Sequence, residues 1–207
     1  MTDPDTLDDE RASELFTIQA IYPELVIDSQ NPSAASLDIP VAPAKAFPVI
    51  FPPLGGGAPA HPPTPPSSDG AESATTKPAT GPGIPEIRYL SYLPPLNLHI
   101  ILPDGYPELA SPQVELTANP SWIPESKLKD LENTALELWK RGGQNQMVFD
   151  YIDSLQQAAE EGLNLVSKGG SALELGQELE IALLDFDLKA KRAKFEQETF
   201  ECGVCLG

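Results

Sequence analysis

The stretch Leu102-Pro103-Asp104-Gly105-Tyr106-Pro107, which continues to Ser111-Pro112, is the most distinctive part of this sequence. Pro103-Asp104-Gly105 has the composition of a tight turn. The prolines at 107 and 112 fix the backbone angle φ and remove amide hydrogens, whereas Tyr106 can bury its ring and bond the backbone through its hydroxyl group. The stretch therefore predicts a stiff loop that carries no strand pairing.

The residues on both sides of this loop alternate with the period of a β-strand. Before it, Ile87, Tyr89 and Ser91 alternate with their neighbours, Pro94-Pro95 interrupts the pattern, and apolar residues then resume it at Leu96, Leu98, Ile100 and Leu102. These residues predict two strands that form a hairpin. After the loop, Val114-Glu115-Leu116-Thr117 predicts a short further strand.

Apolar residues at helical spacing predict one helix before the strands and two after them. Asp8 and Asp9 stand where an N-cap and first-turn acids are expected, and the apolar pattern that follows ends at Pro23; its members are Ala12, Leu15, Ile18 and Tyr22. A second helix is predicted from Pro124 to Gly142-Gly143, and a third from Val148 to Leu163. The expected order is helix, strands, two helices.

Residues 31–85 have a different composition, since they hold 14 of the 23 prolines together with many glycines and serines. Such a segment buries too little apolar surface to offset its ordering entropy, so we expect a largely disordered insertion within one domain. A strand is predicted only at 36–41, and more weakly at 47–51. Pro62 to Pro66 would suit a groove that binds polyproline, although no basic residue flanks it closely.

The overall charge excludes several classes of partner. Among 207 residues, 13 are Lys or Arg and 31 are Asp or Glu, which leaves a net charge of -18. A chain of this charge repels nucleic-acid phosphates and anionic lipids, so we expect neither nucleic acid nor membrane as a partner. The acidic start and the lack of a run near the ~20 apolar residues of a membrane span favour a cytoplasmic protein, with the nucleus as an alternative.

The order of elements, the Tyr106-Pro107 loop and Trp122 together resemble the RWD domain, a relative of ubiquitin-conjugating enzymes, over residues 7–165. The family motif has Tyr-Pro, then three residues, then a proline that is often followed by a second; here Ser111 occupies the first proline site and Pro112 the second. The resemblance implies an α+β fold, a sandwich of one helix, a four-stranded meander and two closing helices. It also implies a partner-binding domain that is not a catalyst.

The residues themselves also argue against catalysis. Conjugating enzymes act through a cysteine thiolate, and residues 1–201 contain no cysteine. The histidines are His61, in the predicted insertion, and His99, on the strand face opposite Leu98 and Ile100. We interpret His99 as a solvated strand residue.

Residues 171–198 predict a long amphipathic helix, because apolar residues share one stripe and acids precede bases, as the helix dipole favours. Gly176 weakens its start. The helix would either pack on its own domain or connect the domain to a neighbouring module.

Cys202 and Cys205 have the Cys-x-x-Cys spacing with which two thiolates bind one zinc ion. A structural zinc site has four ligands, so this pair is half a site and implies a chain truncated within a zinc module. A redox pair of the thioredoxin type is the rival interpretation, but it would open a helix after a strand.

The helix and Phe200-Glu201-Cys202-Gly203-Val204-Cys205 resemble the approach to the first RING finger of RING-between-RING (RBR) E3 ubiquitin ligases. In that resemblance Cys202 and Cys205 are the first two zinc ligands, and a ubiquitin-charged conjugating enzyme is the partner of the intact ligase. No catalytic residue carries over. The alternative is a free-standing RWD adaptor without ligase activity.

Overall fold

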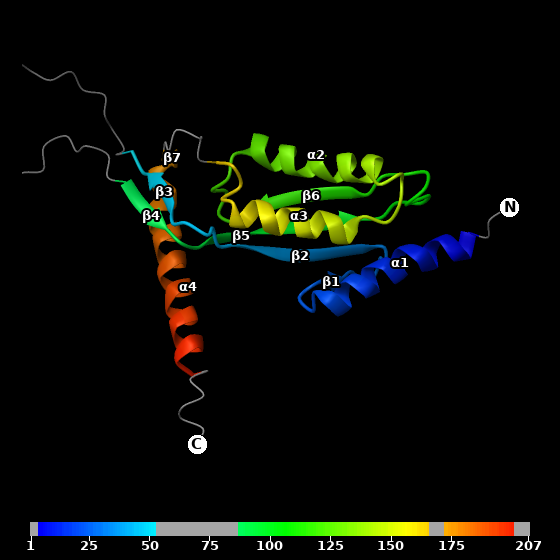
Figure 1. Ribbon diagram of the computed structural model, residues 1–207, viewed down its shortest axis with the longest axis horizontal. Helices are drawn as coiled ribbons and strands as arrows, with labels where there is room; N and C mark the ends of the chain where they lie inside the picture. The colour runs from blue at the N-terminus through cyan, green and yellow to red at the C-terminus, as the bar shows by residue number, and fades with distance from the viewer. Residues whose placement is uncertain (1–3, 53–86, 166–171, 201–207) are drawn as a thin grey trace, which may run out of the picture.

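A computed structural model describes residues 4–52, 87–165 and 172–200 (Figure 1). Its elements, in chain order, are α1 (Pro4–Ile21), β1 (Val26–Ile27), β2 (Ala34–Val41), β3 (Phe47–Ile50), β4 (Ile87–Leu90), β5 (Leu93–Ile101), β6 (Gln113–Ala118), α2 (Glu125–Arg141), α3 (Val148–Glu160), β7 (Leu173–Glu174), the 3-10 helix η1 (Gln177–Leu179) and α4 (Glu180–Phe200). The first helix begins at Pro4, earlier than the predicted Asp8, since proline is well suited to a first helical position.

The main sheet is antiparallel, with the strand order β1-β2-β5-β6. Alternate residues of its central strands point into the core, among them Leu37 opposite Leu98 and Ile39 opposite Leu96. Helix α3 packs against β2 and α2 against β6, so both helices cover the same face of the sheet (Figure 1). This arrangement confirms the predicted α+β sandwich of the RWD type.

The predicted hairpin of the strands around residues 87–102 is wrong. β4 pairs with β3, whereas β5 lies between β2 and β6. Pro94-Pro95 does not end a strand but lies inside β5, where the register shifts between Ile39 and Val41. Prolines lack the amide hydrogen that a ladder needs, and a bulge is the position in a strand where that loss is tolerated.

Much of the near end of the predicted insertion is ordered strand. Residues 34–41 form β2, the strand that pairs with both β1 and β5, and residues 47–50 form β3. Alternating burial of Ala35, Leu37, Ile39 and Val41 outweighs the local proline content. β3 and β4, which lie on either side of residues 53–86, pair from Phe47↔Leu90 to Ile50↔Ile87. The remainder of the predicted insertion, from residue 53, lies outside the described residues.

A second sheet of order β4-β3-β7 leads into the last helix. Leu173 and Glu174 pair in parallel with Val49 and Ile50, so the helix predicted over 171–198 begins only at Glu180. The reason is local: a strand pairing and Gly176 occupy the residues where its first turns were expected. No helix of the described ranges is long and apolar enough to cross a membrane.

Helix α4 is docked by its first half and leaves the domain with its second half (Figure 1). Leu183 is fully buried, and Asp187 is 6% exposed. The Asp187 Oδ1 atom accepts hydrogen bonds from the amides of Ser91 at 2.8 Å and Tyr92 at 3.0 Å, and Lys191 Nζ lies 2.6 Å from Oδ2. Residues 191–199 are all exposed. The first half therefore packs on its own domain.

Replacing Asp187 by alanine should loosen this docking. Two partly buried amides would lose their acceptor, which costs about 1–3 kcal/mol. We expect D187A to lower the free energy of unfolding in urea by that amount and to speed amide exchange in α4. The matched control is D185A, which removes the exposed Lys189–Asp185 pair on the same helix and should cost less than about 0.5 kcal/mol. Equal stabilities of the two variants would contradict the docking role of Asp187.

Candidate functional site

The loop after β5 is closed by hydrogen bonds between nearby backbone groups and is anchored by the buried ring of Tyr106. Tyr106 is fully buried, and its amide donates to the Pro103 carbonyl at 3.0 Å. Gly105 has a φ of +84°, and a Cβ atom there would lie 3.1 Å from the Cβ of Leu109, so the turn requires glycine. The Tyr106–Pro107 peptide is cis, and Pro107 and Pro112 are both buried.

The Tyr106 hydroxyl joins this loop to two helices. It donates to Glu14 Oε1 of α1 at 3.2 Å and accepts from the Met147 amide at 3.0 Å. Glu14 Oε1 also accepts from the amide of Val148, the first residue of α3, at 3.0 Å. The first amides of a helix have no partner within the helix, so Glu14 and Tyr106 together cap α3 from distant parts of the chain.

Burial shifts the pKa values of both Glu14 and Tyr106. It raises the pKa of Glu14 above the ordinary 4.5, although the hydrogen bonds from Val148, Tyr106 and Met147 oppose the rise. Burial, and then the nearby Glu14 carboxyl, raise the pKa of Tyr106 as well. The phenol therefore stays protonated and able to donate. Glu14 is 6% exposed, and its second oxygen, Oε2, accepts no hydrogen bond.

Two tryptophans donate hydrogen bonds to backbone carbonyls, one at the bulge of β5 and one in the loop after β5. Trp122 is 1% exposed, and its indole N–H donates to the carbonyl of Pro94 at 3.1 Å. The indole N–H of Trp139, in α2, donates to the carbonyl of Pro107 at 2.7 Å. Trp122, Tyr106, Pro107 and Pro112, which the sequence singled out, thus belong to one framework.

Sequence reasoning missed the charged members of this framework, Glu14 and Arg11. Both are 6% exposed, and Arg11 Nη1 donates to the Leu102 carbonyl at 3.1 Å and to Asp104 Oδ1 at 2.8 Å. The available signal was their position, because residues 11 and 14 share the apolar face of α1 with Leu15 and Ile18. Charges on that face require partners inside the fold.

The remaining predicted site residues do not form a reactive cluster. Cys202, Cys205 and His61 lie outside the described residues. His99 is half-buried, and its Nδ1 lies 3.1 Å from the hydroxyl of Ser36 on the neighbouring strand. The described residues include no cysteine, and no group of three or more His, Cys, Asp or Glu side chains among them could hold a metal ion. The buried polar side chains of Arg11, Glu14 and Tyr106 instead connect elements that are distant in the sequence.

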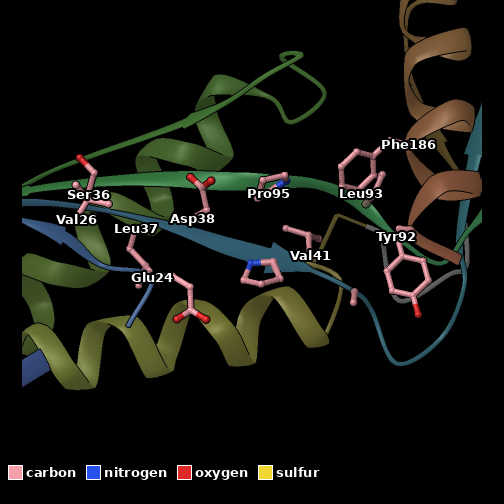
Figure 2. Close-up of a pocket in the computed structure, with 13 residues that line it drawn as sticks. Glu24, Val26, Ser36, Leu37, Asp38, Val41, Tyr92, Leu93, Pro95 and Phe186 are labelled. Carbon is pink, nitrogen blue, oxygen red and sulfur yellow. The ribbon is translucent and has the colours of Figure 1, made fainter. Parts of the chain in front are cut away.

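A groove of about 540 Å³ runs along β2 to the side of α4. Figure 2 shows Glu24 and Val26 at one end and Tyr92 and Phe186 at the other, with Leu37, Asp38 and Val41 of β2 between them. Most of the lining side chains are apolar; the charged ones in the described part of the chain are Glu24 and Asp38. A site of this composition binds by shape and apolar contact.

Comparison with known proteins agrees with the RWD-type fold. The RWD domain family matches residues 9–159, and the chain belongs to that family. The chain is 27% identical to the E3 ubiquitin-protein ligase itt1 of Schizosaccharomyces pombe (strain 972 / ATCC 24843) over 199 residues, which are 94% of this chain and 38% of itt1.

A second relative is the E3 ubiquitin-protein ligase RNF14 of Danio rerio, which is 25% identical over 151 residues, 56% of this chain and 32% of the relative. The chain thus spans about a third of the length of these curated relatives. No solved structure matches the chain. The chain is therefore a member of the RWD family that is similar to two proteins named as E3 ubiquitin-protein ligases.

The buried Glu14 carboxyl should make stability depend on pH. Because its pKa is raised in the folded state, the folded protein binds this proton more tightly than the unfolded chain. Its contribution is complete below pH 4.5 and is lost as pH rises through the folded pKa, by at most about 1.4 kcal/mol per pH unit. Glu14→Gln removes the titration, so urea unfolding should show the wild-type stability falling relative to E14Q above pH 4.5.

The matched control is Glu137→Gln, an exposed carboxyl on α2, which should track the wild type at every pH. A constant difference between the wild type and E14Q, or one that grows in favour of the wild type as pH rises, would contradict the burial effect at Glu14.

Proposed function

We propose that this chain is the non-catalytic, protein-binding region of an RBR-type E3 ubiquitin ligase. The observation that carries the proposal is the similarity to itt1, which includes the RWD domain and extends over 94% of the chain. The relatives bear the name of E3 ubiquitin-protein ligase. In this proposal the RWD domain binds protein partners, and ubiquitin transfer belongs to zinc modules of the same ligase.

Chemistry supports a non-catalytic role for this region. Thioester transfer requires a thiolate beside groups that orient the incoming amine. The chain's only cysteines are Cys202 and Cys205, and both follow the region matched by the RWD family. In the described core, buried polar groups instead form hydrogen bonds between elements, as Tyr106 and Glu14 do at the start of α3.

Zinc is the cofactor that the proposal implies, and the chain offers part of a site for it. Thiolates are suitable zinc ligands, and Cys202 and Cys205 would supply two of the four that a structural site uses. The described residues supply no cluster that could complete the shell. When bound, zinc would cross-link the chain after α4 and orient that helix toward the module it leads into. The partners proposed for the ligase are a ubiquitin-charged conjugating enzyme and a substrate protein, in the cytoplasm or the nucleus.

The first test measures thioester formation. Incubation of the chain with a ubiquitin-charged conjugating enzyme should give no ubiquitin adduct that a reducing agent removes, because the region matched by the RWD family contains no cysteine that could act as the nucleophile. The assay compares reducing and non-reducing gels, with full-length itt1 in a parallel reaction as the positive reference. A reducible ubiquitin adduct on the chain that disappears in a C202S/C205S variant would refute the non-catalytic assignment.

The second test measures zinc. Two thiolates leave half of the tetrahedral shell to water, so binding should be weak and metal analysis after dialysis should find well under one zinc ion per chain. The small amount retained should vanish in C202S/C205S. One tightly held ion per chain would contradict the half-site, and one ion per two chains would indicate that two copies share it.

A further inference from the structure

The outer edge of β2 is only partly paired. β1 covers it at Ala35 and Ser36, and the Asp28 amide continues the pairing to the carbonyl of Ala34 at 2.9 Å. Beyond Ser36, no strand of the described chain pairs with this edge, although β5 pairs with the opposite edge as far as Val41. An exposed strand edge is a template for another strand, and here it forms one side of the groove in Figure 2.

Two backbone hydrogen bonds establish which backbone groups of β2 face outward. The Ser33 carbonyl accepts from Leu102 on the β5 side, and the Ala34 carbonyl accepts from Asp28 on the β1 side. Because these directions alternate along a strand, Leu37 faces β5, whereas Asp38 directs its N–H and C=O to the open edge. Pro40, two residues on, has no amide hydrogen and can only accept. No hydrogen bond within the described residues uses the backbone groups of Asp38.

The side chains along this edge determine which kinds of residue an added strand would present on each of its two faces. Ser36, Asp38 and Pro40 are exposed on one face, while Leu37, Ile39 and Val41 are buried on the other. A residue directly opposite Asp38 would point to the same face as its carboxylate, and its neighbours would point toward the apolar side of the groove. The pattern that fits is therefore alternation of a charged and an apolar residue.

The charges that line the groove determine whether the charged residues of the added strand are acidic or basic. Glu24 and Asp38 line the groove, and no basic side chain of the described residues lines it. Both carboxylates are exposed, Asp38 accepts a hydrogen bond from Asn97, and the chain as a whole carries a net charge of -18. An acidic strand would be repelled and a basic one attracted.

We propose that the open edge of β2, from Leu37 to Val41, binds a partner protein through an extended segment in which basic and apolar residues alternate. The segment adds to the sheet as an antiparallel strand of about five residues, or roughly 17 Å. Its basic side chains pair with Asp38 and Glu24, and its apolar side chains fill the groove beside Leu37, Val41 and Phe186. The proposal rests on the protein-binding role of the RWD domain and names the surface that performs it.

The test uses the full 207-residue chain, labelled with 15N, and an acetylated octapeptide (Val-Lys)4 as the probe. In an NMR titration, the amide shifts of Ser36 to Ile39 and of Val41 should change and saturate. The peptide (Val-Glu)4 should leave them unchanged. A probe N-methylated at every lysine cannot donate to the β2 edge and should lose binding, whereas a probe N-methylated at every valine keeps the required donors and should retain it.

Protein variants separate the edge from general attraction to an acidic protein. Asp38→Lys should weaken (Val-Lys)4 binding about fivefold, in line with roughly 1 kcal/mol for a partly exposed charge pair. Glu137→Lys makes the same charge change on the exposed face of α2 and should leave the affinity unchanged. The dispersed amide spectrum of each variant verifies that it is folded.

Three outcomes would overturn the proposal: no saturable shifts at Ser36 to Val41, equal binding of the two N-methylated probes, or equal weakening by D38K and E137K. The thioester and zinc measurements do not depend on β2. An adverse result in either of them would refute the non-catalytic assignment or the zinc half-site of the proposed function, whereas failure of the peptide titration alone would refute only the binding edge.

Discussion

The bond network around the Tyr106 hydroxyl is the constraint on which the rest of this structure depends. It connects α1 through Glu14, the loop after β5, and the first amides of α3, three segments far apart in the sequence. Removing any one member leaves buried polar groups without partners, and each such group costs more than a single exposed hydrogen bond contributes. The raised pKa of Glu14 shows that burying this carboxyl has a net cost, which the assembled core offsets.

The hydrogen bonds of this framework also bear on the outer edge of β2. Trp122 bonds the β5 bulge at Pro94 and Trp139 of α2 bonds the Tyr106 loop at Pro107, while β2 and β6 pair with the two edges of β5. β2 is therefore held at its β5 edge, while its other edge stays open past Ser36. A rigid edge loses little entropy when a strand is added, which favours binding by a segment that is itself extended.

Helix α4 contacts the domain through only part of its length. Its first half is fixed by Leu183 and by the Asp187 carboxylate over the β4–β5 connection, and its second half is exposed on all sides. The same helix contributes Phe186 and Ala190 to the groove along β2. Within the proposed ligase, a partner seated in that groove would touch the element that leads toward Cys202 and Cys205.

The sequence by itself determined the helices, the stiff Tyr106-Pro107 loop and the family, because periodic burial and turn chemistry are local properties that single segments display. Tertiary structure decided what depends on distant pairing. β2 and β3 form in a proline-rich stretch because partners at β5 and β4 complete them, and β7 replaces the first turns of α4 because Val49 and Ile50 lie beside it. The sequence shows only that Glu14 lies on the apolar face of the first helix; its bonds to Tyr106 and Val148 form only when the folded chain brings these residues together.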